Sequence, residues 1–571
     1  MSRFEAGSAA RYGSDLIVDL LIAEGIEHVA FNPGASFRGI HDSLAQNPGA
    51  PEMALCMHEA VAVAIAQGYA KATGEPMAVL LHNVVGLQNA AMAIYNAWCD
   101  RVPMLLLGGT GPKSKAERRP WIDWIHTANA QAQIVRDYIK WDDEPHDAAS
   151  IAESFARAAT TTRSAPAGPV YLCYDVALQE DPLPDGVETP DLKTYAVPTA
   201  PAPAHSDMVC VLDALRAAQR PAILAGHAGA DGAAMADLAA LAEGLGAPVV
   251  DSGVRFALAT DHPHNATGID DVLAEADVVL VLDCDDVQLR LGRRFEDPSL
   301  TILTVGLGHL RLRGWSHDYQ GLAPASRHLT ASAASAVSVL NDLLRERPLD
   351  PATVATRTAK LTERTATARA AWREHGRAAE APGAVPLSRL IHLTGEALSG
   401  QNFVLANGTN DRLEHRQWTM DQPRQYLGWH AGGGLGYGAG ATIGAALGLD
   451  DGTIAVDIQA DGDLLFLPSA LWTAAHLGLP TLFVVHNNRQ YGNTVEHSAS
   501  LAAHRGRPDQ RYAGAGLTEP AVDLAAMARS FGVWAAGPIT DPQDLEARLA
   551  EAVAVVAGGR PALLDVITPG H

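Results

Sequence analysis

Residues 458–488 read IQADGDLLFLPSALWTAAHLGLPTLFVVHNN, and this stretch decides the fold of the last third of the chain. An apolar strand runs up to Asp461, a helical stretch follows, and a second apolar strand runs up to Asn488. Two parallel strands joined by one crossover end at the same edge of a sheet, and ligands of such sheets bind at that edge. We therefore expect Asp461 and Asn488 to lie close together.

The oxygen atoms expected at this edge suit a hard divalent cation. The Asp461 carboxylate, the Asn488 amide oxygen and the main-chain carbonyl of Gln490 are ligands that Mg²⁺ or Ca²⁺ prefers, and phosphate oxygens and water would fill the remaining positions. Gly462 would let a phosphate approach the backbone. The alternative interpretation is a surface turn followed by an unrelated pair of asparagines.

The same alternation of strands and helices runs through the whole chain. Short apolar runs alternate with helical patterns in three successive segments, separated by a proline-rich stretch at 189–207 and a second linker at 381–386. This pattern is typical of parallel sheets with helices on both faces. The predicted fold class is α/β, with three doubly wound parallel-sheet domains over residues 1–188, 189–380 and 381–571.

The composition argues against several classes of protein. The chain has 571 residues, with 65 acidic against 42 basic side chains and a net charge of −23, so nucleic acid and anionic membranes are poor partners. No apolar stretch reaches the ~20 residues of a membrane helix, and no secretory signal opens the chain, so we expect a cytoplasmic enzyme. Five scattered cysteines without a CxxC pair are expected to be buried free thiols: Cys56, Cys99, Cys173, Cys210 and Cys284.

Residues 458–488 resemble the diphosphate-binding motif of thiamine-diphosphate-dependent enzymes, although Ala460 stands where that motif begins with glycine. The resemblance implies thiamine diphosphate and Mg²⁺ as cofactors, with the metal held by Asp461, Asn488 and Gln490. It also implies that the three domains are, in chain order, pyrimidine-binding, central and diphosphate-binding. Further cofactor-binding residues implied by the resemblance are Gly462, Asp463 and Tyr491.

A glycine-rich stretch, GWHAGGGLGYGAGATIGAALG (428–448), precedes this motif. In the resembling family a large apolar side chain at this place holds the cofactor bent, and Leu435 is the matching residue. The resemblance further implies that the Gly433 carbonyl accepts a hydrogen bond from the cofactor's amino group and that Thr409 contacts the diphosphate. The alternative is a glycine-rich helix start that packs tightly for its own reasons.

Thiamine chemistry also requires an acid that acts on the pyrimidine ring of the cofactor. Glu59, at the start of the helical stretch EAVAVAIAQGYAKATG (59–74), matches the catalytic glutamate of the family. There the glutamate reaches the cofactor held by the other subunit, so the resemblance implies a homodimer or homotetramer with sites at the dimer interface. The alternative is an exposed glutamate that stabilises the helix start.

The chain most resembles the branch that holds benzoylformate decarboxylase, acetolactate synthase and 2-hydroxyacyl-CoA lyase. His82 lies 23 residues after Glu59, as the active-site histidine of the decarboxylase does, and is a candidate for moving protons near neutral pH. The alternative for His82 is a histidine that caps a strand end. His430 is a further candidate for placing protons. The serine of the family's NPGS motif is replaced by Ala35, with Ser36 next in line, so a carboxylate-binding role does not carry over directly.

The segment after the asparagine pair, RQYGNTVEHSASLAAHRGRPDQR (489–511), departs from the decarboxylase pattern. Glu496 is a candidate catalytic residue, and its neighbour His497 adds to a polar pair that suggests a substrate unlike benzoylformate. A basic group follows: His504, Arg505, Arg507 and Arg511. These side chains could grip a phosphate-bearing substrate such as an acyl-coenzyme A, or they could form a solvated loop.

Two further stretches have no single interpretation from sequence. Trp121, Trp124 and His126, within ERRPWIDWIHTANAQ (117–131), shape either the substrate pocket or the dimer contact. GHAGADG (226–232) resembles a nucleotide-binding turn, and in relatives this central domain holds ADP, FAD or no nucleotide. A lone glycine-rich turn is weak support for a nucleotide.

These features together predict a thiamine-diphosphate-dependent carbon–carbon lyase that acts on a small-molecule substrate. The leading hypothesis is decarboxylation of a 2-oxo acid. One alternative is cleavage of a 2-hydroxyacyl-coenzyme A to formyl-coenzyme A and a carbonyl compound, and another is carboligation as in acetolactate synthase. A hypothesis from another class is a non-catalytic relative that only binds a nucleotide or assembles with a partner.

Overall fold

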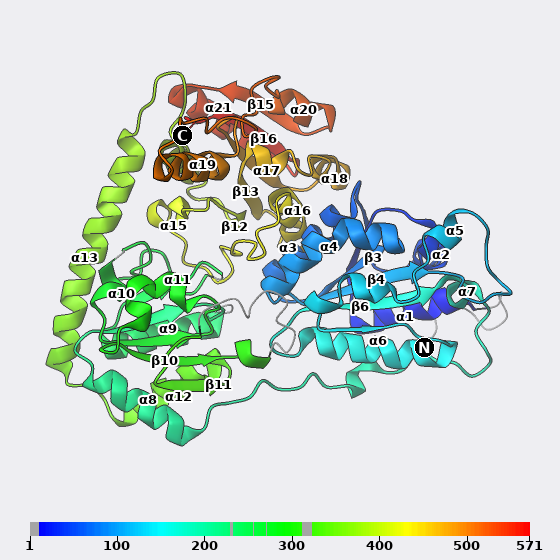
Figure 1. Cartoon of the computed structure of the whole chain (residues 1–571), viewed down its shortest axis with the longest axis horizontal. Helices are drawn as coiled ribbons and strands as arrows, with labels where there is room; N and C mark the ends of the chain where they lie inside the picture. The colour runs from blue at the N-terminus through cyan, green and yellow to red at the C-terminus, as the bar shows by residue number, and fades with distance from the viewer. Residues whose placement is uncertain (1–10, 229–231, 255, 270, 311–321, 571) are drawn as a thin grey trace. The chain divides into compact units, whose positions relative to one another are not determined.

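The computed structural model describes residues 11–228, 232–254, 256–269, 271–310 and 322–570. The chain separates into two compact units (Figure 1). One unit holds the residues up to Thr199 together with His430–Asp450 and Leu467–Leu477, and the other holds Ala200–Trp429, Asp451–Phe466 and the residues from Gly478 onward. The predicted domain boundaries therefore stay a prediction, but each of the three sheets lies inside one predicted segment.

The first unit contains a six-stranded sheet in which all paired strands are parallel, with the order β2-β1-β3-β4-β6-β5. Its strands are β1 (His28–Phe31), β2 (Glu52–Leu55), β3 (Met77–Leu81), β4 (Met104–Thr110), β5 (Trp141–Asp143) and β6 (Pro169–Asp175). Its helices before residue 200 are α1 (Gly13–Glu24), α2 (Arg38–Gln46), α3 (Glu59–Thr73), α4 (Val84–Cys99), α5 (Ile122–Ile125), α6 (Ala148–Arg163) and α7 (Val176–Glu180). Strand β3 is buried at every residue, as expected where helices cover both faces.

The first unit also includes α16 (Tyr437–Gly448) and α18 (Ala470–Leu477). Helix α16 packs closely against α3, because glycines stand where the two helices meet. A Cβ added at Gly68 would lie 1.9 Å from the Ala441 carbonyl oxygen, and one at Gly444 would lie 1.8 Å from the Ile65 oxygen. The small-residue pattern of 428–448 is thus needed for helix packing in this unit.

The second unit contains two five-stranded parallel sheets, of which one belongs to the middle of the chain. It has the order β11-β10-β9-β7-β8 and the strands β7 (Pro221–Ala225), β8 (Val249–Asp251), β9 (Val278–Leu282), β10 (Thr301–Gly306) and β11 (Arg327–Thr330). Its helices are α8 (His205–Ala217), α9 (Gly232–Leu245), α10 (Asp271–Glu275), α11 (Val287–Leu291) and α12 (Ala333–Glu346). Leucines and valines from α8, α9 and α12 bury one face of this sheet.

The other sheet of this unit has the order β12-β13-β14-β16-β15. Its strands are β12 (Phe403–Asn407), β13 (Ile454–Ala460), β14 (Thr481–Asn487), β15 (Trp534–Ile539) and β16 (Ala562–Ile567). Its helices are α14 (Leu387–Ala397), α15 (Leu413–Gln417), α17 (Asp461–Leu464), α19 (Gly492–His504), α20 (Leu524–Ser530) and α21 (Pro542–Ala557). The long helix α13 (Pro351–Ala378), light green in Figure 1, joins the two sheets of the unit.

Two sequence-based expectations about the fold have definite outcomes. The prediction of three parallel-sheet α/β domains is confirmed. The expectation that all five cysteines are buried is wrong, because Cys210 is exposed on α8 and Cys284 is half-buried after β9, while Cys56, Cys99 and Cys173 are buried. No helix in the described part of the chain is long and apolar enough to span a membrane.

Candidate active site

The predicted metal ligands follow the neighbouring ends of β13 and β14 at one edge of the third sheet. The two strands pair in parallel up to Ala460 and His486, so Asp461 follows β13 next to Asn487, the last residue of β14, and Asn488 comes one residue later. Asp461 begins the short helix α17 instead of ending the strand. The predicted adjacency of these strand ends is confirmed, whereas the metal-binding role stays a prediction.

Asp461 is a buried carboxylate, and one of its oxygens has no hydrogen-bond partner in the described part of the chain. Its side chain is 2% exposed, and Oδ1 has no hydrogen-bond partner among the described residues. Burial raises the pKa of the Asp461 carboxyl to about 6, although main-chain N–H groups at Gly462 and Arg489 oppose the rise. A divalent cation would supply the missing counter-charge, so this donor atom fits the predicted metal.

The two asparagines that follow β14 have different environments. Asn487 is buried, and its Nδ2 donates to Asp565 Oδ1 at 2.8 Å, which ties β14 to β16. Asn488 is half-buried, and its Oδ1 accepts the Gln490 main-chain N–H at 3.1 Å. This turn carries Gln490, whose side chain is buried. Asn487 therefore has a structural role, and Asn488 with the Gln490 carbonyl stays the candidate for the ligand pair.

Gly462 allows a close approach between α17 and the turn after β14. A Cβ at position 462 would lie 2.8 Å from Tyr491 Cε1, so only glycine leaves room for the Tyr491 ring. Asp463 is half-buried on the same short helix. Both Tyr491 and Asp463 thus lie at the edge where the sequence predicted cofactor contacts.

Thr409 is held by a neighbour that the sequence analysis missed. Its Oγ1 donates to Glu414 Oε2 at 2.9 Å and accepts the Leu413 N–H at 3.1 Å, while its main-chain N–H donates to Glu414 Oε1 at 2.8 Å. The hydroxyl and amide that were expected to meet a diphosphate are therefore both engaged by α15. Contact between Thr409 and a diphosphate stays a prediction.

Glu59 opens α3 in the first unit and is 4% exposed, so the alternative of an exposed helix-start glutamate is wrong. Two side-chain amides orient its carboxylate. Asn32 Nδ2, after β1, donates to Oε1 at 3.2 Å, and Asn89 Nδ2, on α4, donates to Oε2 at 3.1 Å. A Cβ at Gly86 would lie 3.2 Å from Glu59 Oε1, so a glycine keeps the space beside the carboxylate clear.

His82 follows β3 and belongs to the same neighbourhood as Glu59. Its Nδ1 lies 2.8 Å from Ser36 Oγ, which also accepts the Asn83 main-chain N–H at 3.0 Å. Burial, and then the charge of His126, lower the pKa of His82, against the opposing effect of Glu59. The rings of His82 and His126 meet edge to face with centroids 5.7 Å apart. Ser36, the residue after the Ala35 that replaces the serine of the family motif, therefore holds His82 by a hydrogen bond.

The glycine-rich loop that carries Gly433 and Leu435 is fastened to α4. Asn96 forms two hydrogen bonds with Gly434: its Nδ2 donates to the Gly434 carbonyl at 3.1 Å, and its Oδ1 accepts the Gly434 N–H at 3.0 Å. Asp100 Oδ1 accepts the Ala431 N–H at 3.0 Å. Leu435 itself stays 41% exposed. Leu435 is thus an exposed apolar side chain on an anchored loop, and its predicted contact with the cofactor stays a prediction.

His430 lies buried at the start of this loop. Burial lowers the pKa of His430 to about 4; Asp100 opposes the shift and Lys71 adds to it. Asp100 also forms a fully buried ion pair with Lys71 at 2.5 Å. His430 is therefore neutral at pH 7 and packs against the anchor of the loop, and its predicted part in proton transfer is untested.

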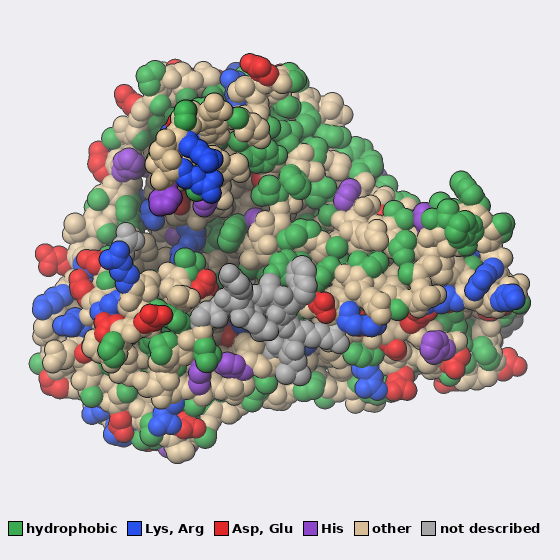
Figure 2. Space-filling view, viewed as in Figure 1, with side chains coloured by type: hydrophobic (Ala, Val, Ile, Leu, Met, Phe, Trp, Pro, Cys, Tyr) green, Lys and Arg blue, Asp and Glu red, His purple; other side chains and the backbone are tan. Residues whose placement is uncertain are grey.

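The remaining predicted residues lie on exposed surfaces. Glu496, His497 and His504 are exposed on α19, Arg505 is exposed just after it, and Arg511 pairs with Asp509. Figure 2 shows basic and histidine side chains gathered over the position of α19. The stretch 489–511 is thus a helix followed by a basic turn.

The structure describes much of the two stretches, 117–131 and 226–232, that had no single interpretation from the sequence. Trp121 is 75% exposed and Trp124 is also exposed, whereas His126 reaches His82. In the turn predicted to bind a nucleotide, residues 229–231 lie outside the described residues. Gly226 is required there for packing, because a Cβ would lie 2.2 Å from the Asp283 carbonyl oxygen. That glycine therefore has a reason to be present without any nucleotide.

Comparison with known proteins places these clusters in a family. Profiles of thiamine pyrophosphate (TPP) enzymes match three parts of the chain: the N-terminal TPP binding domain at 11–135, the central domain at 209–304 and the C-terminal TPP binding domain at 406–566. The chain belongs to the thiamine pyrophosphate enzyme family. Glu59 and His82 fall in the first matched domain, and Asp461 and Asn488 fall in the last.

This TPP enzyme has decarboxylases and synthases among its relatives. It is 27% identical over 563 residues to benzoylformate decarboxylase of Pseudomonas aeruginosa, covering 96% of this chain and 97% of that protein. It is 24% identical over 577 residues to the large subunit of acetolactate synthase isozyme 3 of Escherichia coli, covering 98% and 95%. The structure of the thiamine diphosphate-dependent 4-hydroxybenzoylformate decarboxylase of Rhodococcus jostii RHA1 matches with a TM-score of 0.78 at 21% identity, covering 98% of this chain and all of that chain.

Proposed function

We propose that this TPP enzyme decarboxylates a 2-oxo acid. The observation that carries the proposal is the cluster of Glu59, His82 and Ser36, in which a buried carboxylate and a hydrogen-bonded histidine of lowered pKa lie around the same glycine, Gly86. In such a pair Glu59 would act on the cofactor ring and His82 on the substrate. General acid–base catalysis of this kind contributes about 10²–10⁴-fold in rate. The similarity to benzoylformate decarboxylase supports the same reaction.

Thiamine diphosphate and Mg²⁺ are the cofactors of the proposal. Asp461, Asn488 and the Gln490 carbonyl would hold the metal, and the unpaired, buried Oδ1 of Asp461 fits this assignment. Gly462, Asp463 and Tyr491 would lie along the diphosphate. When bound, thiamine diphosphate supplies a carbon nucleophile and accepts the electron pair that is released when the bond to the carboxylate breaks.

In the proposal Glu59 exchanges a proton with the pyrimidine ring of the cofactor. Asn32 and Asn89 fix the direction of the carboxylate, and burial excludes water from it. Leu435, on the anchored loop, would pack against the cofactor, and the Gly433 carbonyl would accept a hydrogen bond from its amino group. Because in this family the glutamate acts across the subunit interface, we propose a homodimer or homotetramer in which Glu59 serves the cofactor bound by the partner subunit.

His82 places protons on the substrate side in this account. If the Ser36 hydroxyl donates to Nδ1, the neutral ring carries its proton on Nε2, where it can be given to the reacting atoms. The hydrogen-bond pattern favours this tautomer. Ser36 Oγ already accepts the Asn83 N–H, so its hydroxyl proton is available to donate to His82 Nδ1. The lowered pKa keeps the His82 ring neutral in most molecules at pH 7.

A second candidate function is cleavage of a 2-hydroxyacyl-coenzyme A. The exposed basic group at the end of α19 and in the turn after it, His504, Arg505 and Arg507, is the observation that favours it, because coenzyme A carries phosphates. Carboligation, as in the acetolactate synthase relative, remains an alternative use of the same cofactor. Glu496 on α19 stays the candidate for a further catalytic residue that places protons under either reaction.

The distinguishing experiment is a single-turnover acid quench with NMR of the cofactor adducts. The holoenzyme is mixed with a panel of 2-oxo acids and, separately, with 2-hydroxyacyl-coenzyme A esters. We expect an adduct with a 2-oxo acid that loses CO₂ and leaves as an aldehyde. An adduct formed only with the coenzyme A esters, with release of formyl-coenzyme A, would replace the proposal by the second candidate.

A further inference from the structure

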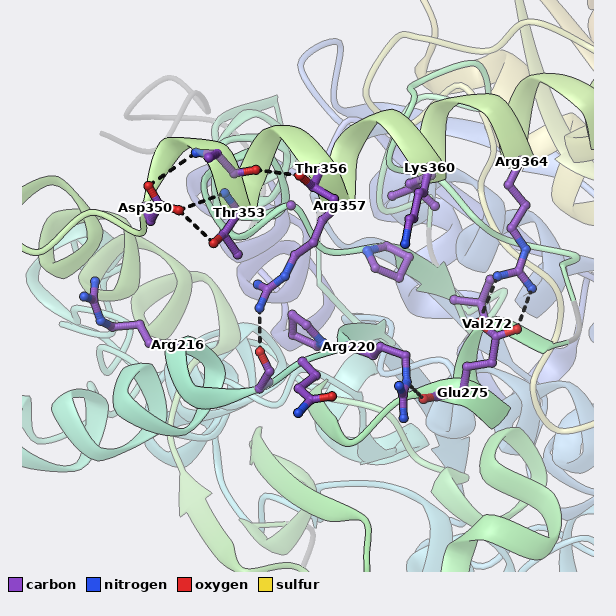
Figure 3. A pocket seen from close by; sticks show the side chains of 17 residues that line it. Arg216, Arg220, Val272, Glu275, Asp350, Thr353, Thr356, Arg357, Lys360 and Arg364 are labelled. Atoms are coloured by element: carbon purple, nitrogen blue, oxygen red, sulfur yellow. Dashed lines mark hydrogen bonds and ion pairs between the residues drawn. The ribbon is translucent and has the colours of Figure 1, made fainter.

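The second sheet has a groove at the edge where its strands begin. Its volume is about 830 Å³, and it lies between α13 and the segments that lead into β7 and β8, which contribute Pro221 and Pro248 (Figure 3). Ligands of doubly wound sheets usually bind at the opposite, carboxyl edge. The groove is therefore distinct from the 226–232 turn, which follows the end of β7.

Five cationic side chains line this groove, although the chain carries a net charge of −23. Arg357, Lys360 and Arg364 come from one side of α13, and their spacing along the helix covers about 10 Å. Arg216 at the end of α8 and Arg220 just before β7 line it from the sheet side. Figure 3 shows Arg357 and Lys360 pointing from α13 toward the sheet.

Most of these positive charges have no carboxylate partner. Arg216 donates to the Pro348 carbonyl at 2.8 Å, and Arg357 donates to the Leu245 carbonyl at 3.0 Å. Arg220 Nε donates to the Glu275 carbonyl at 2.6 Å. Carbonyl oxygens fix the positions of these guanidinium groups without neutralising them, and the Asp277 carboxylate only partly offsets the charges of Arg220 and Arg357. No described residue forms a hydrogen bond or ion pair with the Lys360 ammonium group, which lies between Arg357 and Arg364.

The carboxylates around the groove already have other partners. Glu275 and Asp271 both pair with Arg364. Asp350 caps α13 and accepts the N–H groups of Ala352 and Thr353. Asp277 accepts the main-chain N–H groups of residues 219 and 220 at 2.7 and 2.9 Å. The residues that line the groove thus comprise five cationic side chains and two carboxylates, Glu275 and Asp350, so the lining carries an excess of positive charge that can attract an anion from solution.

The lining also includes an apolar part, made by Ala218, Pro221, Pro248, Val272 and Leu361. The volume falls within the range of about 300–1,000 Å³ that small-molecule sites occupy. A ligand that satisfies both parts carries two or more linked anionic groups and a flat, weakly polar ring. We propose that this groove binds an organic diphosphate of nucleotide size, with its phosphates between α13 and residues 216–220.

Binding of ADP to the holoenzyme, measured by isothermal titration calorimetry, tests this site. Lys360 is exposed and without a described partner, so Lys360→Glu should fold normally, as thermal unfolding would verify. We expect it to weaken ADP binding by about tenfold or more, since a charge-assisted contact becomes repulsive. Arg220→Ala should weaken it as well. Lys193→Glu, the same change at another exposed lysine, should leave the affinity unchanged.

The position of the ligand is tested by photolabelling with 8-azido-ADP followed by peptide mapping. We expect the label in peptides that contain residues 216–221 or 351–364, and weaker binding of adenosine and of inorganic pyrophosphate than of ADP. Absence of ADP binding, equal affinity in wild type and Lys360→Glu, or a label confined to the 226–232 turn would each overturn the proposal.

Discussion

His82 is bonded on one side to Ser36 and faces His126 on the other, so its titration reports on the candidate site. Burial and the charge of His126 place the folded-state pKa of His82 below the ordinary value of 6.5. The folded state therefore disfavours the protonated ring. The stability linked to this group is present above pH 6.5 and is lost as the pH falls below 6.5 toward the folded pKa.

Replacing His126 should move the acid limb of the activity profile. In His126→Ala the opposing charge is gone, so the pKa of His82 rises and the acid limb of kcat/KM shifts to higher pH. The measurement is kcat/KM against pH for the 2-oxo acid that the adduct panel identifies. Trp124→Ala, two residues earlier on α5, is the control and should leave the acid limb in place. An acid limb that does not move in His126→Ala would contradict this role of His126.

His82→Ala should lower kcat by about 10²–10³-fold if the ring transfers protons in the reaction. Thiamine diphosphate affinity should change little, because His82 is assigned to the substrate side. Steady-state kinetics together with a cofactor titration separate the two effects. A variant that loses cofactor affinity but keeps kcat at saturation would show that His82 has only a structural role.

Asp461→Asn should remove the metal and, with it, tight cofactor binding. Loss of an outer partner of a metal ligand costs about 10–100-fold in affinity, and loss of the ligand itself should cost at least as much. Mg²⁺-dependent cofactor binding, followed by fluorescence or calorimetry, measures the effect. Asp450→Asn changes an exposed carboxylate nearby in sequence and should have none; equal behaviour of the two variants would exclude Asp461 as a ligand.

At the scale of elements, the packing of α3 against α16 depends on glycine. A methyl group at Gly68 meets the Ala441 carbonyl at 1.9 Å, so Gly68→Ala should destabilise the fold by about 1–3 kcal/mol through overpacking. Gly244→Ala in α9 is the matched change, because its Cβ comes no nearer than 3.4 Å to Leu344, and it should stabilise by about 0.5–1 kcal/mol. Urea unfolding compares them; a neutral Gly68→Ala would show that the contact relaxes.

The sequence predicted the elements better than the contacts between them. The adjacency of β13 and β14 followed from the apolar runs on either side of one helical stretch, because the period and length of such runs are local properties. The pairing of Ser36 with His82 joins residues 46 positions apart, and Asn96 holds Gly434 from 338 positions away. Such contacts depend on how the elements pack, so single-sequence patterns predicted the candidate residues but not the amides and hydroxyls that orient them.

For the whole molecule, the proposed assembly makes a quantitative prediction. If Glu59 serves the cofactor of the partner subunit, a heterodimer of Glu59→Gln with Asp461→Asn contains one doubly altered site and one intact site. Random exchange of two such inactive variants gives half heterodimers, and activity should return to about a quarter of the wild-type value. Assays before and after subunit exchange measure this. Failure to recover activity, with exchange shown by native mass spectrometry, would place both residues in the same subunit's site.

The central claim is that Glu59 activates thiamine diphosphate in this chain, and proton exchange at C2 of the bound cofactor tests it most directly. The holoenzyme is mixed with D₂O, quenched with acid, and the remaining C2 proton is counted by NMR. We predict exchange far faster than in free thiamine diphosphate, and slower by at least about 10²-fold in Glu59→Gln. A wild-type rate no faster than that of the free cofactor would contradict the account and indicate a non-catalytic relative.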